Sequence, residues 1–412
     1  MRSIAAKQRF DTLVLDASLR QSLVTVRCLG RRGLGIAAAE THPRAPAFAS
    51  RWCQRGLVFS AKEGTDAYYE MLEHWLERTG AGLLIASHDA TIALLRSYRA
   101  RLEPRVHLAL AAEPALAIAI NKERTLAVAR GLGLQVPREA VVRNDDEIAA
   151  ALDAIGLPAV IKPCESWLWN GRDGVRLGAK LAVTRAEAQH AIEAVTRFGQ
   201  AVQVQQLLTG RREAVSFLYA KGEVYARFAQ WAMRTSPPLG GDSVLRQSIA
   251  IPPDIGSQAE SLVREIDLEG YCEVEFRRDA AGVPYLMEIN PRLSASVEIA
   301  VRAGVDFPYL LYQWASGGPI ERVAGYHTGG WMRHLGGDIT TMVASLRQRG
   351  RPGITRPVQT LVNFGRAFLK PMAYDYMNWT DPLPAVRAMA NFTQGALRSL
   401  ASAAVFGAWY LP

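Results

Sequence analysis

The sequence is short of the features that mark secreted, zinc-binding and membrane-spanning proteins. It has four cysteines in 412 residues, Cys28, Cys53, Cys164 and Cys272, with no CxxC spacing among them. This pattern argues against a disulfide framework or a zinc site and favours a reducing compartment. The first residues hold no apolar run suited to a signal peptide, and no stretch approaches the ~20 apolar residues of a membrane span. We therefore expect a cytoplasmic protein.

Several familiar catalytic and binding signatures are missing as well. The sequence contains no HExxH motif and no recognisable Ser/His/Asp pattern. The segment "GRRGLG" at 30–35 is not GxGxxG, and it follows a predicted helix at 20–32 instead of preceding one. A glycine C-cap with a turn is the favoured interpretation there. No recognition helix or RNP-like motif is present, so we expect no nucleic-acid partner.

The composition is that of a globular protein with an uneven charge. Hydrophobic residues make up 49% of the chain and charged residues 21%, and the length suffices for two or three domains. The net charge is +9, and residues 331–412 contribute +6 of it, with nine Lys and Arg against three Asp and Glu. A basic segment of this kind suggests an acidic partner or a membrane surface.

The order of predicted elements divides the chain into three parts. Strands expected at 12–16, 34–40, 83–87 and 106–111 are separated by helical patterns such as 67–79, which predicts a parallel α/β domain over 1–118. From 119 to 320, hairpins and antiparallel strands mix with helices, which is typical of an α+β domain. Residues 321–412 are basic and mostly helical in pattern.

The stretch "PYLMEINPR" at 284–292 has the pattern of a β-strand with an unusually polar face. Alternation sends Glu288, Asn290 and Arg292 to the same side. If residues 271–292 form a hairpin centred on Ala280 and Ala281, Glu275 lies opposite Leu286 and diagonal to Glu288. Diagonal neighbours are about 7–8 Å apart, close enough for both carboxylates to share one ion.

These side chains are suited to a metal and a phosphate. Carboxylate and amide oxygens are hard ligands that favour Mg²⁺, which keeps water and substrate phosphates as its other ligands. The planar fork of Arg292 fits a phosphate or a carboxylate. The alternative is a polar strand face covered by solvent or by salt bridges. The four residues together favour the metal–phosphate hypothesis.

An ordered set of segments resembles the ATP-grasp superfamily, in particular its carboxylate–amine ligases and the ATP-grasp domains of the carbamoyl phosphate synthase large chain. "EVEF…YLMEINPR" is similar to the closing signature of the family, which implies Glu275, Glu288 and Asn290 as magnesium ligands with Arg292 beside them. The resemblance covers about 119–320, and 1–118 is similar to the domain that precedes it in the family. It implies an α/β N-terminal domain, an α+β ATP-grasp fold and a helical C-terminal segment.

Further segments in the family order imply nucleotide-binding residues. "NKERT" and "AVIKP" resemble the segments with two phosphate-binding lysines, and "QVQQLLTGRREAVSF" resembles the adenine-binding hinge with its ribose-binding glutamate. A glycine-containing loop at 167–178 is expected over the phosphates. Arg234 is expected either to clamp a substrate carboxylate or phosphate or merely to end a hairpin. The implied nucleotide-binding residues are Lys122, Lys162, Gly171, Gly174, Gln205, Gln206, Leu207, Leu208 and Glu213.

The resemblance implies a ligase that depends on ATP and Mg²⁺, with Mn²⁺ as a possible substitute. It joins a small-molecule carboxylate to an amine or another nucleophile through an acyl phosphate, and it releases ADP and phosphate. The alternatives are a carbamoyl-phosphate-synthase-like or biotin-carboxylase-like activity and a non-catalytic nucleotide-binding protein. Nothing resembles a glutaminase or a biotin-attachment segment, which disfavours the first two, and the complete metal set disfavours the third. Neither the substrates nor the oligomeric state follow from the sequence.

The end of the chain has two interpretations. Residues 390–409 predict a helix with Phe392, Leu397, Leu400, Ala404 and Val405 along one side. A helical cap packed on the core is favoured. Peripheral contact with an anionic membrane, or with an acidic partner, is the alternative, because basic residues beside an apolar aromatic face suit such an interface.

Overall fold

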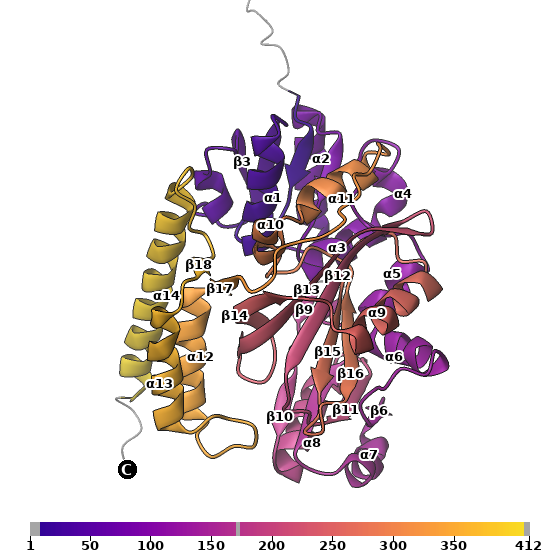
Figure 1. Ribbon diagram of the computed structural model, residues 1–412, viewed down its shortest axis with the longest axis vertical. Coiled ribbons are helices and arrows are strands. Elements are labelled where there is room, and N and C mark those ends of the chain that lie inside the picture. The colour runs from indigo at the N-terminus through magenta and orange to yellow at the C-terminus, as the bar shows by residue number, and fades with distance from the viewer. Residues whose placement is uncertain (1–8, 170–173, 408–412) are drawn as a thin grey trace, which may run out of the picture.

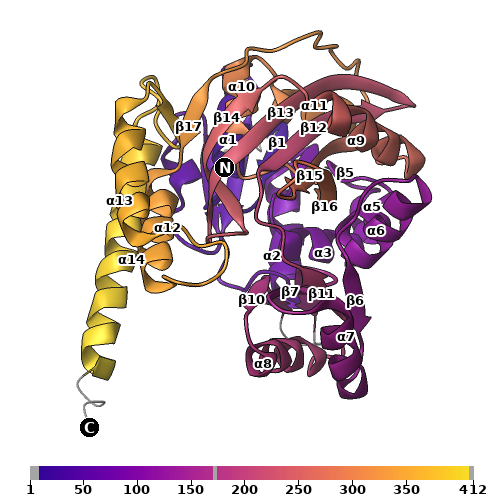
Figure 2. The same ribbon diagram turned by 60° about the horizontal axis from the view of Figure 1, so that its bottom comes forward.

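The computed structural model describes residues 9–169 and 174–407, with side chains described for all of these except 168, 169 and 399–407. Figure 1 shows the chain beginning in a compact α/β unit, continuing through two further sheets and ending in helices along one side. Figure 2 shows the same three parts from another direction.

The N-terminal unit is a five-stranded parallel sheet in the order β3-β2-β1-β4-β5. Its strands are β1 (Thr12–Val14), β2 (Ile36–Glu40), β3 (Arg55–Val58), β4 (Leu83–Ile85) and β5 (His107–Leu108). Its helices are α1 (Arg20–Arg31), η1 (Pro46–Ala49), α2 (Asp66–Thr79), α3 (Asp89–Ser97) and α4 (Arg99–Leu102). β4 is shorter than predicted because the Ser87 and His88 amides donate to Asp16 Oδ2, at 2.7 and 2.8 Å, beyond the end of the ladder.

A small antiparallel sheet follows, in the order β10-β7-β11-β6. Helices α5 and α6 connect it to the first unit, and α7 and α8 pack on it over a separate apolar core. The expected loop at 167–178 contains a short hairpin, β8 paired with β9. The elements are α5 (Ala115–Ile120), α6 (Lys122–Gly131), β6 (Glu139–Val142), η2 (Asp145–Glu147), α7 (Ile148–Ile155), β7 (Ala159–Pro163), β8 (Trp167–Trp169), β9 (Gly174–Arg176), β10 (Lys180–Ala182), α8 (Arg185–Thr196) and β11 (Val202–Gln206).

The largest sheet has seven strands in the order β16-β15-β12-β13-β14-β17-β18. The predicted hairpin about Lys221 and Gly222 is confirmed, with φ of 51° and 75° at these residues, as a two-residue turn of this hand requires. The elements of this part are β12 (Arg212–Ala220), β13 (Glu223–Ser236), β14 (Asp242–Ile249), α9 (Pro253–Glu265), β15 (Gly270–Arg278), β16 (Pro284–Asn290), α10 (Glu298–Ala303), α11 (Phe307–Ala315) and β17 (Trp331–Arg333).

The pairing of β15 with β16 differs from the predicted register. Glu275 lies opposite Glu288, and Leu286 lies opposite Phe276, so the predicted Glu275–Leu286 pair is wrong. The Asp279 carboxylate accepts the amides of residues 281 and 283, both at 2.9 Å, which moves the start of pairing to Pro284. A bulge beside Glu275 then adds one more residue to β16. The two carboxylates are therefore direct rather than diagonal neighbours.

The C-terminal segment forms a layer of helices beside the large sheet (Figures 1 and 2). The predicted helix over 390–409 is part of a longer one that begins at Leu383. The side chains of Leu400, Ala404 and Val405, named in that prediction, lie outside those described. The elements are α12 (Leu335–Arg347), α13 (Pro357–Arg366), η3 (Ala367–Leu369), β18 (Ala373–Tyr374) and α14 (Leu383–Gly407). Among the helices described, none is long and apolar enough to span a membrane.

Three buried aspartates attach this segment to the rest of the chain. They are the three acidic residues of 331–412, namely Asp338, Asp375 and Asp381. Asp375 binds two arginines, Arg20 of α1 at 2.9 Å and Arg246 of β14 at 2.7 Å. Asp381 binds a further arginine of α1, and Asp338 binds Arg333 and Arg234. A carboxylate buried between two guanidiniums retains its charge without water, so each pair fixes one point of the segment.

We expect Asp375→Asn to lower the free energy of unfolding by about 3–5 kcal/mol, because Arg246 would remain buried without a charged partner and Arg20 would keep only Asp242, at 3.2 Å. Burial raises the pKa of Asp375, but the charges of Arg246 and Arg20 have the larger, opposite effect. The pKa therefore lies below its ordinary value. The contribution of this pair is thus present above the ordinary aspartate pKa of about 3.9 and is lost as the pH falls below it.

Denaturant unfolding at neutral pH measures this effect. Asp153→Asn serves as the control, because Asp153 pairs with Arg185 on the surface, where both side chains are more than half exposed. Equal stability of the two variants would contradict the anchoring role of Asp375.

Candidate functional site

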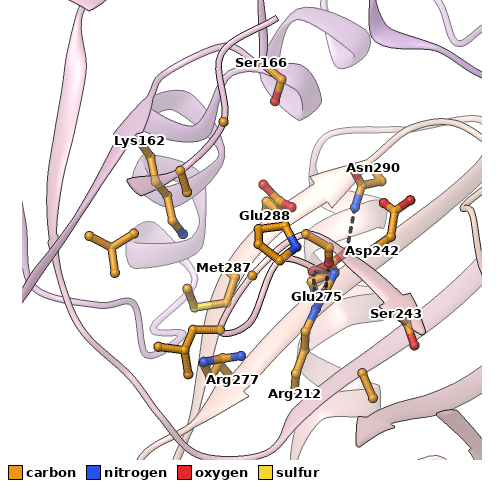
Figure 3. A pocket seen from close by; sticks show the side chains of 18 of the residues that line it. Lys162, Ser166, Arg212, Asp242, Ser243, Glu275, Arg277, Met287, Glu288 and Asn290 are labelled. Carbon is orange, nitrogen blue, oxygen red and sulfur yellow. Dashed lines mark hydrogen bonds and ion pairs between the residues drawn. The ribbon is translucent and has the colours of Figure 1, made fainter. Parts of the chain in front are cut away.

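A cavity of about 520 Å³ lies between the small antiparallel sheet and one face of the large sheet. β7, β10 and β11 supply one wall, and β12, β15 and β16 supply the other. The loop between β13 and β14, residues 237–241, closes one side. Figure 3 shows side chains from both walls pointing into this space.

Carboxylates from two neighbouring strands meet in the cavity. Glu275 lies opposite Glu288, and Glu273 lies opposite Asn290, so all four side chains share one face of the sheet. The Asn290 amide donates to Glu275 Oε1 at 2.9 Å, and Arg212 donates through Nε to Glu275 Oε2 at 2.8 Å (Figure 3). Glu273 accepts from Gln230 at 2.8 Å. Glu288 lies 3.6 Å from the Lys122 amine.

The carboxylates differ in how readily they ionise. Burial raises the pKa of Glu275 to about 7, and the nearby charge of Glu288 acts in the same direction. Burial likewise raises the pKa of Glu273. Burial also opposes ionisation of Glu288, but Lys122 and Lys162 outweigh it and hold its pKa below the ordinary value. Glu288 is therefore the carboxylate best able to bind a cation at neutral pH.

Two lysines approach the carboxylates from the opposite wall. Lys162 extends from β7 toward Glu288 (Figure 3), and burial lowers its pKa to about 8 despite the charge of Glu288. Lys122, at the start of α6, is held by Ser166 Oγ at 3.1 Å. Both lysines line the cavity, so they can neutralise anionic groups that enter it.

The hinge segment lies beside the lysines. Gln205, Gln206, Leu207 and Leu208 all line the cavity. Gln205 is buried, and its side-chain amide has no hydrogen-bond partner among the described residues. A buried amide of this kind has the donor and the acceptor that a heterocyclic ring requires, so it fits a ligand in the cavity.

Glu213 also lines the cavity, but both of its carboxylate oxygens are paired with arginines. Arg278 donates to Oε2 at 2.6 Å, and Arg211 lies 3.0 Å from Oε1. A ribose hydroxyl would have to share these oxygens with two guanidiniums.

The glycine loop is arranged differently from what we predicted. Gly171 lies outside the described residues, and Gly174 does not line the cavity but is covered by Trp167. A Cβ at residue 174 would stand 1.7 Å from the Trp167 ring. The same ring packs on Gly64 and lies 6.2 Å from the His88 ring, so it joins the hairpin to the N-terminal unit. Arg176 and Gly178, farther along, line the cavity instead.

The end of the cavity nearest the N-terminal unit is rich in ion pairs. Arg292 donates to Asp89 through Nε at 2.6 Å, which connects the end of β16 to the start of α3. Burial raises the pKa of Asp89, but Arg292 outweighs it and holds this pKa below its ordinary value. Asp242, at the start of β14, lies 3.2 Å from Arg20. Arg176 has no ion pair among the described residues, so it is an available cation at this end.

The structure does not bring Arg234 to this cavity. Its guanidinium binds Asp338 at 2.5 and 2.6 Å and lines a smaller cavity of about 360 Å³ between the large sheet and α12. Asp338 is fully buried, and its ion pair holds the Arg234 guanidinium at this second cavity. Arg234 lies within β13, opposite Leu245 of β14 and two residues before the strand ends, and its role as a clamp stays a prediction.

Several residues of the cavity were not identified from the sequence. Glu273 could have been found, because "CEVEF" places it two residues before Glu275 and hence on the same face. Asp89 directly follows a predicted strand end, where ligands often bind in α/β sheets. No sequence pattern pointed to Arg212 or Arg277, since an arginine in a strand can as well lie on a face exposed to solvent.

The oxygens fit a divalent cation whose ligand shell is completed by a substrate. Among the described residues, no three His, Cys, Asp or Glu side chains are grouped so as to hold a metal ion by themselves. Glu288 and Asn290 Oδ1 are hard oxygen donors, and Glu275 is within one hydrogen bond of Asn290. This arrangement suits Mg²⁺, which is usually bound by one or two carboxylates together with water and phosphate oxygens.

Comparison with known proteins finds similarity to ATP-grasp proteins. Residues 203–333 match a family model described as ATP-grasp in the biosynthetic pathway with Ter operon. D-alanine–D-alanine ligase B of Xanthomonas campestris pv. campestris is 26% identical over 220 residues, which cover 48% of this chain and 64% of that protein. The match thus spans less than two thirds of the length of this relative.

Solved structures share the fold at low identity. The biotin carboxylase domain of 2-oxoglutarate carboxylase from Hydrogenobacter thermophilus, in complex with MgADP, ADP and bicarbonate, has a TM-score of 0.63 at 14% identity, covering 79% of this chain and 74% of that one. An L-amino acid ligase from Bacillus licheniformis has a TM-score of 0.57 at 16% identity, covering 76% and 77%. The predicted fold class is confirmed: a parallel α/β sheet, then antiparallel sheets of the ATP-grasp type, then helices.

Proposed function

Since this chain belongs to the ATP-grasp superfamily, we propose that it is an ATP- and Mg²⁺-dependent ligase that joins a small carboxylate to an amine. The observation that carries the proposal is the meeting of Glu275, Glu288 and Asn290 with two lysines in one cavity. Similarity to a D-alanine–D-alanine ligase and to an L-amino acid ligase supports carbon–nitrogen bond formation. We retain the division at about residues 118 and 320, and a cytoplasmic location, as parts of the proposal.

The nucleotide would lie between the two walls of the cavity. Lys162 and Lys122 bind the phosphates, and residues 206–208 present their backbone to the adenine while the free amide of Gln205 bonds to its edge. Glu213 can reach the ribose if Arg211 or Arg278 releases an oxygen. Glu288, Asn290 and Glu275 would hold Mg²⁺, which supplies positive charge against the terminal phosphates.

The reaction then needs positioning and charge neutralisation more than acid–base catalysis. A carboxylate oxygen attacks the γ-phosphorus, the bond from the γ-phosphorus to the bridging oxygen breaks, and ADP leaves with that oxygen. The amine nitrogen attacks the acyl carbon, the bond to phosphate breaks, and the amine loses a proton. The Arg292–Asp89 ion pair and the Arg176 guanidinium border the end of the cavity where the carboxylate would lie.

We expect Glu288→Ala and Asn290→Ala each to abolish Mg²⁺-dependent ATP turnover, because each removes one of the three oxygen ligands proposed for the cation. The fold should persist, since both side chains lie on the polar wall of a cavity and are partly exposed. Phosphate release with increasing Mg²⁺ and a thermal melt measure the two quantities. Glu265→Ala, a change of the same kind at an exposed position of α9, is the control. Full turnover by either site variant at saturating Mg²⁺ would refute the metal assignment.

We expect ADP and phosphate as products, because Lys162, Lys122 and the metal ligands converge where the terminal phosphates would lie. Chromatography of the nucleotide after incubation with pairs of small carboxylates and amines separates ADP from AMP. Formation of AMP and pyrophosphate would mean that the α-phosphorus is attacked, and the acyl-phosphate mechanism would be wrong.

Nucleotide affinity should decrease above about pH 8, where Lys162 loses its proton. Below that pH the free protein already carries the cation that attracts phosphate. Above it, binding must take up a proton, so Kd should rise about tenfold per pH unit. Calorimetric titration with ADP between pH 7 and pH 9 tests this slope, and Lys162→Arg, whose charge persists, should remove it. A slope unchanged in this variant would show that another group titrates.

A further inference from the structure

The C-terminal segment leaves a large apolar face uncovered, which we call the outer face. Trp379 is 91% exposed and Leu369 is 84% exposed, values that are unusual for side chains of this size. The outer face comprises Val358, Leu361, Val362, Phe368, Leu369, Met377, Trp379, Leu383, Val386, Met389 and Leu397. These residues belong to α13, η3, the loop that follows β18, and α14, and these elements stand along the same side of the molecule in both views (Figures 1 and 2).

The rest of the chain covers the opposite side of these helices. Asp375, Asp381 and Asp338 hold the segment to the core from within, and the Asn391 amide donates to the Arg44 carbonyl at 2.9 Å. Phe392, on α14, lies against the start of α12 at Gly336. The core therefore contacts one side of the segment, while the eleven apolar side chains of the outer face stay exposed. Exposed apolar side chains gathered in one segment are typical of an interaction site.

The charge on this segment has one sign. All three of its acidic residues are buried in ion pairs with arginines, so in its described part every exposed charged side chain is a cation. The exposed cations are Arg347, Arg349, Arg356, Arg366, Lys370 and Arg398. Arg51, from another part of the chain, donates to the carbonyl of Thr380 and so adds to the positive charge beside Trp379. Arg302 donates to the carbonyl of Met377, but its charge is paired with Glu298.

We propose that the outer face binds the surface of an anionic lipid bilayer, with Trp379 and Leu369 inserted at the level of the headgroups and the arginines against the lipid phosphates. An apolar face bordered by cations has the two components of interfacial binding, buried apolar area and attraction to anionic lipid. Tryptophan favours this depth because its ring is apolar while its N–H can be hydrated.

A second copy of the chain fits this face less well. A symmetric pair would bring the outer face against itself, since a two-fold axis places the same surface on both partners. The cations of one copy would then oppose those of the other, without acidic residues between them. The residues that line the larger cavity all precede residue 297, so binding through the outer face leaves the cavity accessible.

Sedimentation of the full chain with vesicles tests the proposal. We expect it to bind vesicles of phosphatidylcholine with about 30% phosphatidylglycerol, to bind phosphatidylcholine alone at least tenfold more weakly, and to dissociate as salt is added. Vesicles with brominated acyl chains should quench tryptophan fluorescence of the unaltered chain. In Trp379→Phe this quenching should be lost while binding largely persists.

Two pairs of variants separate the contributions. Trp379→Ser with Leu369→Ser should reduce binding at least tenfold, whereas Val58→Ser with Leu132→Ser, which alters exposed apolar residues elsewhere, should not. Arg366→Gln with Arg398→Gln should weaken binding to anionic vesicles, whereas Arg124→Gln with Arg197→Gln should leave it unchanged. None of these residues lines the larger cavity, so ATP turnover in solution should be unaffected by the outer-face variants.

The proposal is overturned if the chain does not sediment with anionic vesicles, or if it binds neutral vesicles equally well. It is also overturned if light scattering shows a dimer that the Trp379→Ser and Leu369→Ser pair converts to a monomer, because the outer face would then be an interface between copies.

Discussion

The register between β15 and β16 is the constraint on which the cavity depends. One bulge beside Glu275 decides that Glu288 faces Glu275 and that Asn290 faces Glu273. A shift by one residue would turn Glu288 and Asn290 to the opposite side of the sheet, among the apolar side chains of the core. The Asp279 turn and the bulge together set this register, and the convergence of oxygen donors follows from it.

Like charges this close require compensation, and the surrounding structure supplies it. Arg212, directly before Glu213 on β12, neutralises Glu275, and Lys122 and Lys162 do the same for Glu288 from the opposite wall. Each cation comes from a different strand or helix, so the cluster is stable only when both sheets are in place. The pKa of Glu275 is raised all the same, chiefly by burial and in addition by the charges of Glu288 and Glu273. A divalent cation and a polyphosphate would complete this balance of charge.

The C-terminal segment uses charge in the opposite way. It places its three acidic residues inside, against arginines of α1 and of the large sheet, and exposes six of its nine basic residues, whereas Arg333 is buried. The described surface of this segment is therefore positively charged, because its acidic residues are buried in ion pairs with arginines. Buried ion pairs attach the helices to the core, and the apolar and basic side chains that remain exposed are the basis of the proposed membrane contact.

The sequence by itself determined the order of the elements and the residues that could bind a metal and phosphates. Periodicity of two in "YLMEIN" places Glu288 and Asn290 on one face of any strand, and the apolar residues before Lys162 place it at the end of a strand, because these patterns depend on neighbours in the chain. The turn at Lys221 and Gly222 could be predicted for the same reason, because a two-residue turn depends on residues that are adjacent in the chain.

Only the tertiary structure decided what lies opposite these residues. The bulge that pairs Glu275 with Glu288, the Trp167 ring that covers Gly174 and the Asp338 carboxylate that removes Arg234 from the cavity all involve partners brought close by folding. Asp338 is 104 residues from Arg234 in the chain, and Asp375 is 355 residues from Arg20. No local pattern encodes such contacts, because a side chain's charge and size are the same whether it faces solvent, a ligand or a buried partner.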